Sequence, residues 1–317
     1  MFTDIQKARM EWSKLRYGMF IHFGPNTFEG TGWGSGAFPA GMFAPANLDV
    51  SQWAQTAVEA GMKYAVLTAK HHDGFCLWPS EHTDYSVRHS PAGIDIVGAF
   101  AEEFRKAGLQ VGLYYSLWDR NYPDYEDDEK YARYMKLQIT ELLTEYGDLV
   151  ELWFDGGWDK EHPTREWPYQ PEWETMPDSG FNRGERWRWE SLYHLIHELQ
   201  PGCLVINNSS SDRPGQVRYM PVDVRTAEHF HYIWQEQECM LPPASGDEHG
   251  LPLEFCTSLN PDWFWTGRSY PHPGVAAIRE WYGEARRHGG NLLLNVGPNR
   301  DGLIPEYHRA MLKQAKI

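Results

Sequence analysis

Short apolar runs alternate with amphipathic stretches along most of the chain. Between most of the apolar runs, hydrophobic positions recur with helical spacing, which predicts helices at 49–61, 95–108, 126–147, 189–200 and 275–289 and a last one after Pro305. The apolar runs predict strands at 18–24, 63–70, 110–116, 149–155, 203–208, 222–226, 254–259 and 291–296. Strand and helix alternation is typical of a parallel sheet covered by helices. Eight such strands favour a (β/α)8 barrel of the TIM type over an open sheet.

One stretch does not follow the alternation. Residues 159–188 are rich in Trp, Pro and Glu and predict a long loop between a strand and its helix rather than a linker between domains. We therefore expect one catalytic domain that spans residues 1–317.

Polar residues stand where the predicted strands end. In a barrel of this class the chemistry lies at the carboxyl ends of the strands. The strand ends carry His22, His71-His72-Asp73, Tyr115-Ser116, Asp155, Asn207-Asn208, a segment near Glu228, and Asn295. Most of these residue types bind or react, so we expect an active site at this end.

Asp155 is the first candidate for a catalytic carboxylate, because it ends a buried apolar run and two glycines follow it. The structural alternative is a helix N-cap. A glycosidase needs a second carboxylate across the scissile bond. The candidates for it are Glu228, Glu236, Glu238, Glu248 and Glu254. Glu228 is favoured because it lies at or just beyond a predicted strand end, the alternative being a solvated loop acid.

Two other kinds of site can be weighed on the residues. His71, His72 and Asp73 could hold a metal, but neighbouring residues of a strand point to opposite faces, so hydrogen bonding to substrate hydroxyls is favoured. The glycine-rich segment 30–36 lacks the phosphate-loop spacing and a following helix. It predicts a loop that presents Trp33 to the pocket.

Composition and net charge limit the classes of molecule that the protein can bind. Of the 317 residues, 41% are hydrophobic and 23% charged, which excludes disorder and coiled coil. The 15 Trp and 17 Tyr combine flat apolar faces with polar edges, which suit a sugar as well as an aromatic core. Lys and Arg number 29 against 44 Asp and Glu, so the net charge of −15 weighs against nucleic acid and anionic membranes.

Cysteine usage and the termini add two expectations. Cys76, Cys203, Cys239 and Cys256 form no CxxC pair, so we expect buried thiols. Residues 1–18 contain no apolar signal region, and no run of about 18 apolar residues occurs. We therefore expect a soluble, cytoplasmic protein.

Five motifs in order resemble the α-L-fucosidases of glycoside hydrolase family 29, and the resemblance runs from about Trp12 to Tyr307. The motifs are YGMFIHFG at 17–24, AKHHDGF at 69–75, LYYS at 113–116, LWFDG at 152–156 and NLLLNVGP at 291–298 followed by Asp301-Gly302. The resemblance implies a (β/α)8-like barrel, retention of configuration, and no metal or organic cofactor. It also implies a fucosylated oligosaccharide or glycoconjugate as substrate.

The resemblance also assigns roles. Asp155 matches the family's nucleophile, and Glu228 matches its acid/base, with Ala227 where proline is common. Glu254 matches another family glutamate and is the alternative acid/base. The predicted substrate-binding residues are His22, Trp33, His71, His72, Tyr115, Trp153, Arg213, Glu254 and Trp265.

The sequence departs from the family at two places. Family members often have Glu-Trp where this chain has Gly32-Trp33, and we expect the family's C-terminal β-sandwich to be absent. Tyr307, Met311 and Leu312 would then leave apolar surface on the last helix, which predicts a homo-oligomer. The linkage preference stays open, as do two other interpretations: a catalytically silent fucose-binding barrel, and a metal-dependent hydrolase that uses His71, His72 and Asp73.

Overall fold

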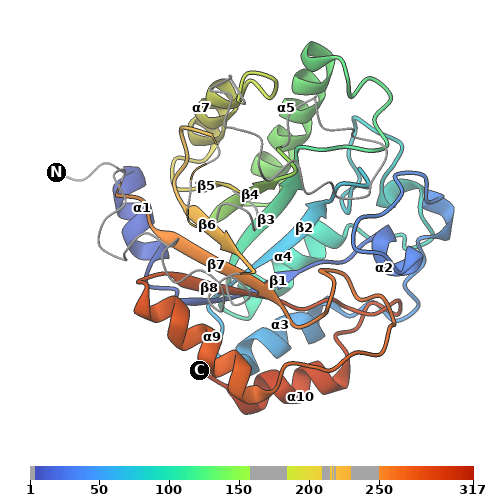
Figure 1. Ribbon diagram of the computed structural model, residues 1–317. Helices are drawn as coiled ribbons and strands as arrows, with labels where there is room; N and C mark the ends of the chain where they lie inside the picture. The colour runs from blue at the N-terminus through green and yellow to red at the C-terminus, as the bar shows by residue number, and fades with distance from the viewer. Residues whose placement is uncertain (1–3, 158–183, 209–214, 216, 218, 230–249) are drawn as a thin grey trace, which may run out of the picture.

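The computed structural model describes residues 4–157, 184–208, 215, 217, 219–229 and 250–317. Within them, eight parallel strands form one sheet in the order β5-β4-β3-β2-β1-β8-β7-β6 (Figure 1). The strands are β1 (Tyr17–Ile21), β2 (Tyr64–Lys70), β3 (Gln110–Ser116), β4 (Glu151–Asp155), β5 (Leu204–Asn207), β6 (Arg225–Glu228), β7 (Leu253–Ser258) and β8 (Asn291–Asn295). A single parallel bridge between Ile206 and Val224 joins β5 to the segment that leads into β6. The predicted (β/α)8 barrel is confirmed.

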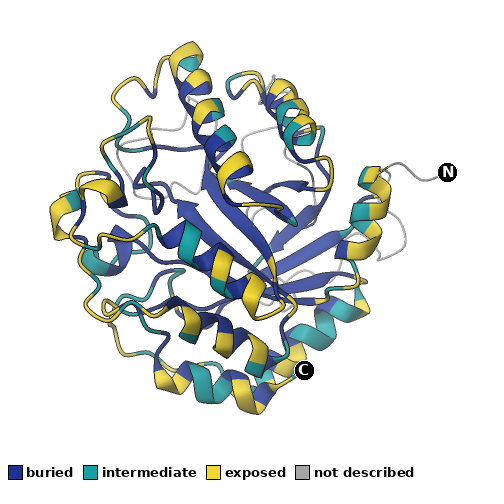
Figure 2. Ribbon diagram, turned by 180° about the vertical axis from the view of Figure 1, so that it is seen from behind, coloured by how far each residue is buried: buried dark blue, intermediate teal, exposed yellow. Residues whose placement is uncertain are grey.

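Helices cover the outside of the sheet and bury one face each (Figure 2). They are α1 (Asp4–Trp12), α2 (Pro25–Glu29), α3 (Val50–Ala60), α4 (Ile96–Lys106), α5 (Asp128–Glu145), α7 (Trp189–Leu199), α9 (Val275–Arg287) and α10 (Glu306–Ala315), with two 3-10 turns, η1 (Ala40–Met42) and η2 (Val87–His89). Asp49 caps α3 by accepting from the Gln52 amide, and Asp95 caps α4 in the same way through Gly98. The sequence did not predict α1, which buries only Trp12 among its residues, or the short α2.

The strands bury both of their faces, so the molecule has two apolar cores. The outer core lies between strands and helices and contains Leu67, Leu113 and Phe154. The inner core fills the barrel with Phe20, Tyr64, Val66, Tyr114, Trp153, Leu204, Ile206, Val224, Cys256 and Leu293. Trp12 of α1 joins the inner core, and its carbonyl accepts from Asn291 at the start of β8. Helix α1 therefore covers the amino-terminal end of the barrel.

Strand β6 begins three residues later than predicted, because Asp223 is engaged by side chains of other elements. Its buried carboxylate accepts from Arg9 (2.7 Å), Tyr193 (2.8 Å), His197 (3.0 Å) and the Val205 amide (2.8 Å). The shift places Glu228 inside the strand as its last residue.

The last helix packs on its own barrel. Leu312 is fully buried and Met311 packs against the outer core, while Tyr307 is 42% exposed. Arg279 of α9 also donates to the carbonyl of Gln314 (2.9 Å). The apolar surface that predicted a homo-oligomer is therefore mostly covered, and self-association stays a prediction for light scattering.

Two smaller expectations can be compared with the described residues. Cys76, Cys203 and Cys256 are free and buried, as predicted, and Cys239 lies outside the described residues. Among the helices of the described part of the chain, none combines the length and apolarity that crossing a membrane requires.

Candidate active site

Asp155 ends β4 at the carboxyl edge of the barrel, with 17% of its side chain exposed. Its Oδ2 accepts from the Tyr114 hydroxyl (2.9 Å) and its Oδ1 from Asn208 Nδ2 (3.2 Å). The chain leaves the strand through Gly156 at φ +68, where a side chain would press on Trp118 and His72. The two glycines that follow Asp155 thus allow the sharp exit that the sequence predicts.

Glu228 ends β6, and 16% of its side chain is exposed. Its Oε2 accepts from Asn208 Nδ2 at 2.6 Å, and Asn208 Oδ1 accepts from the Thr226 hydroxyl at 2.9 Å, which orients the amide. The same nitrogen reaches Asp155, so the two bonded oxygens lie within about 6 Å of each other, compatible with the roughly 5–5.5 Å between the carboxyl groups of a retaining glycosidase. One amide therefore holds both candidate carboxylates.

His22 and His72 have ring orientations fixed by hydrogen bonds. Asn295 Nδ2 donates to the carbonyl of Trp263, so its Oδ1 is the acceptor for His22 Nδ1 (2.7 Å). The Ser116 hydroxyl donates its one proton to the carbonyl of Trp118 and must accept from His72 Nδ1 (2.7 Å). In both histidines the nitrogen without a proton is then Nε2. His72 Nε2 lies 3.7 Å from Asp155 Oδ2.

These histidines are neutral. Burial lowers the pKa of His22 to about 3 and that of His72 to about 4. Burial and the neighbouring His72 also lower the pKa of His71. The His71 ring stacks on Tyr114 with centroids 5.4 Å apart. These three neutral imidazoles have adjoining rings, and His72 approaches Asp155, so they are suited to exchange hydrogen bonds with sugar hydroxyls without adding charge.

Aromatic rings complete the surroundings of the carboxylates. Trp153 stacks on Tyr114 with centroids 5.6 Å apart, and Trp33 lies 5.2 Å from the His72 ring. Trp263, which follows β7, stacks on His22 at 5.1 Å. Trp263 was not among the predicted residues, whereas Trp265 was. The Trp265 ring lies beside Gly267, and its place in the substrate site stays a prediction.

Two predicted residues do not face the pocket. Tyr115 is fully buried in the outer core, where its hydroxyl accepts from Lys70 and donates to Gln138 (2.8 Å), so its prediction as a substrate contact does not fit. Side chains alternate along a strand, and Tyr114 is the tyrosine that faces inward. Glu254 lies inside the barrel with no exposed surface, bonded to Tyr64 and Trp153.

The remaining predictions concern Arg213 and a metal. Arg213 lies outside the described residues. Among the residues that the structure describes, no three His, Cys, Asp or Glu side chains gather as a metal site would require, so His71, His72 and Asp73 supply no ligand set there.

The fold and the paired carboxylates define a (β/α)8 barrel with two acidic side chains at its carboxyl edge, and comparison with known proteins names its family. The family model described as alpha-L-fucosidase matches residues 37–315, and the chain belongs to this family. Alpha-L-fucosidase 1 of Arabidopsis thaliana is 35% identical over 320 residues, covering 96% of this chain and 58% of the relative. Putative alpha-L-fucosidase 1 of Oryza sativa subsp. japonica is also 35% identical, over 97% of this chain and 57% of the relative. The chain therefore spans little more than half the length of these relatives.

A solved structure extends the comparison to the fold. Alpha-L-fucosidase isoenzyme 1 from Paenibacillus thiaminolyticus superposes with a TM-score of 0.77 at 30% identity, covering 99% of this chain and 75% of that one. A glycoside hydrolase 29 family member from an unknown rumen bacterium has a TM-score of 0.77 at 29% identity, covering 98% of this chain and 56% of that one.

Proposed function

We propose that the chain is a retaining α-L-fucosidase that removes terminal α-L-fucosyl residues from glycans or glycoconjugates, with Asp155 as nucleophile and Glu228 as acid/base. The observation that carries the proposal is the shared Asn208 amide, which bonds both carboxylates and keeps the two bonded oxygens within about 6 Å, a separation compatible with a retaining pair. Membership of the alpha-L-fucosidase family supports the choice of sugar.

The proposed reaction has two displacements. In the first, an Asp155 oxygen attacks the anomeric carbon, the bond to the leaving oxygen breaks, and Glu228 gives its proton to that oxygen. In the second, Glu228 takes a proton from water, the water oxygen attacks the anomeric carbon, and Asp155 leaves. The first product detected is then α-L-fucose.

The residues around the carboxylates are proposed to bind the sugar. His22 and His72 would accept hydroxyl protons at Nε2, and the His71 ring lies beside both of theirs, with centroids 5.5 Å from His22 and 4.0 Å from His72. Trp33 and Trp153 would pack on the apolar face of the ring. Arg213 keeps its proposed place in the pocket from the family match alone.

The test is hydrolysis of an aryl α-L-fucoside followed by proton NMR of the first-formed anomer. We expect turnover with α-L-fucose as the initial product. Binding of L-fucose without turnover would instead support the silent fucose-binding barrel, and initial β-L-fucose would exclude retention. A panel of fucosyl oligosaccharides with different linkages would then identify the preferred glycan.

A further inference from the structure

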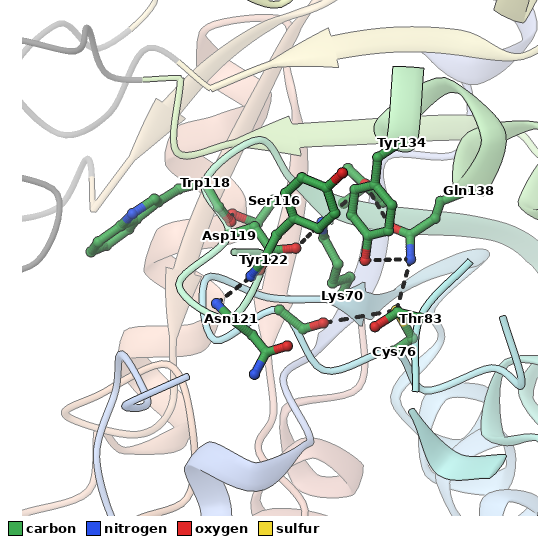
Figure 3. A network of polar contacts seen from close by, with 12 residues as sticks. Lys70, Cys76, Thr83, Ser116, Trp118, Asp119, Asn121, Tyr122, Tyr134 and Gln138 are labelled. Carbon is green, nitrogen blue, oxygen red and sulfur yellow. Dashed lines mark hydrogen bonds and ion pairs between the residues drawn. The ribbon is translucent and has the colours of Figure 1, made fainter. Parts of the chain in front are cut away.

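Apart from the carboxylates Asp155 and Glu228, the described residues contain an ion pair with almost no exposed surface, Lys70 with Asp119 (Figure 3). Lys70 Nζ donates to Asp119 Oδ2 (2.8 Å), to the Tyr115 hydroxyl (2.9 Å) and to the Tyr131 hydroxyl (3.3 Å). An ammonium has three protons, and each has an acceptor here. The cost of removing two charges from water is offset only when all their hydrogen bonds are made. The positions of Lys70 and Asp119 are therefore fixed relative to each other.

Asp119 organises the loop that follows β3, residues 117–122. Its Oδ1 accepts from the backbone amides of Asn121 (3.0 Å) and Tyr122 (2.9 Å), which closes the loop on itself. The same oxygen lies against Gly74, and a Cβ at that position would collide with it. Gly74 also has a φ of +87, which favours glycine. The pair therefore holds the loop after β3 against the segment after β2 that carries His71 and His72.

Arg120 extends from this loop to two other segments of the candidate site. Its backbone amide donates to the His72 carbonyl (2.9 Å), and its Nη1 donates to the Gly34 carbonyl (2.5 Å) in the loop that carries Trp33. Its guanidinium lies 5.3 Å from the Trp118 ring. Trp33 and Trp118 in turn pack beside the His72 ring, at 5.2 and 5.3 Å.

We propose that Arg120 is a positioning residue whose side chain sets the place of Trp33 through the Gly34 carbonyl and that of His72 through the Trp118 ring, and that the Lys70–Asp119 pair anchors it. The proposal rests on the proposed fucosidase function, because His72 and Trp33 are there the groups that bind the sugar. The hydrogen bonds described for Asp155 and Glu228 come from Asn208 and Tyr114, and among the described contacts Arg120 is linked to Asp155 only through His72, whose Nε2 lies 3.7 Å from Asp155 Oδ2. Loss of the Arg120 side chain should therefore weaken substrate binding more than it slows the chemical steps.

The experiment compares Arg120→Met and Arg120→Lys with the wild type on an aryl α-L-fucoside, with L-fucose as competitive inhibitor. For Arg120→Met we expect KM and the inhibition constant of L-fucose to rise about tenfold and kcat to stay within about threefold, the effect of losing charged hydrogen bonds to the loop. Arg120→Lys keeps a charged donor and should restore part of the affinity. Circular dichroism monitors folding, and if Arg120→Met does not fold, Arg120→Lys decides through a smaller rise in KM.

Arg105→Met is the matched control, because Arg105 also donates to a backbone carbonyl, that of Asp148 (2.6 Å), just before β4 begins. We expect it to leave KM unchanged. Three results would overturn the inference and leave the proposed function standing. They are a wild-type KM in Arg120→Met, an equal fall in kcat and in affinity in that variant, and the same change in Arg105→Met. A wild type that neither hydrolyses the fucoside nor binds L-fucose would overturn the proposed function and the inference with it.

Discussion

The barrel contains two pairs of carboxylates, and strand β4 contributes to both. On its inward side it presents Glu151 at its first residue and Asp155 at its last. Glu151 lies in the barrel with Glu254, whereas Asp155 lies at the carboxyl edge with Glu228. Two carboxylate side chains on the same strand therefore have different surroundings.

The surroundings decide what each pair can do. Glu254 has no exposed surface and accepts from the Tyr64 hydroxyl (2.6 Å) and Trp153 Nε1 (2.9 Å). Burial raises the pKa of Glu254 and of Glu151, whose pKa the neighbouring Glu254 raises further. Asp155 and Glu228 keep part of their surface exposed. The comparison assigns the buried pair to the core and the edge pair to chemistry, with Trp153 between them.

The largest expected effect follows from Asp155→Asn. Without a nucleophile the glycosyl intermediate cannot form, so we expect kcat/KM on an aryl α-L-fucoside to fall by about 10⁴-fold or more. Asp155→Gly with added azide should recover turnover and give β-L-fucosyl azide. If the activity of Asp155→Asn were close to that of the wild type, the edge pair would not be assigned to chemistry and would not differ in role from the buried pair.

Glu228→Ala should act through the leaving group. We expect a loss of about 10²–10⁴-fold on a fucosyl disaccharide, whose leaving oxygen needs the proton, and a much smaller loss on an activated aryl fucoside. Glu254→Ala is the comparison variant. If Glu254→Ala showed the selective loss and Glu228→Ala did not, the acid/base would be Glu254.

Asn208→Ala tests the amide that joins the edge pair. Removing one donor shared by two carboxylates should lower kcat/KM by about 10–100-fold, the cost of hydrogen bonds to charged groups. Asn208→Asp adds a negative charge between them and should be worse. Equal activity in Asn208→Ala and the wild type would show that the spacing does not depend on this side chain.

The smallest effect on activity is expected for Glu254→Gln, which should stay near the wild type. Because the pKa of Glu254 is raised in the fold, the folded protein keeps a proton that the unfolded chain releases, and the free energy of unfolding falls as pH rises above the ordinary carboxyl range. Glu254→Gln removes this loss and should be more stable at pH 8, on the order of 1–3 kcal/mol.

Urea unfolding at pH 5 and pH 8 measures this difference. The exposed Glu198 on α7 provides the control Glu198→Gln, for which we expect no change. A Glu254→Gln variant that loses activity while remaining folded would contradict the assignment of the buried pair to the core.

The barrel and several site residues could be predicted from the sequence because their signals are local. An apolar run that ends in a polar residue indicates a strand and its carboxyl end, and this located His22, His72 and Asp155 correctly at the edge of the sheet. The start of the helix predicted at 49–61 is also a local signal, because the Asp49 side chain needs only the nearby Gln52 amide.

Other features depend on which side of the sheet a side chain faces and on partners far away in the sequence. A parallel strand is buried on both faces, so the run LYYS does not reveal that Tyr114 faces the site and Tyr115 the helices. Trp263 and Trp265 are two residues apart in a loop, and only the fold brings Trp263 onto His22. The start of β6 depended on Asp223 and its partners in other elements.

Asp155 of the edge pair is proposed to form the bond to the sugar. The sharpest test of this role is to inactivate the protein with 2-deoxy-2-fluoro-α-L-fucosyl fluoride, digest it and locate the label by mass spectrometry. We expect one fluorofucosyl group on the peptide that contains Asp155 and on its carboxylate. A label on Glu228 or Glu254 instead would contradict this role.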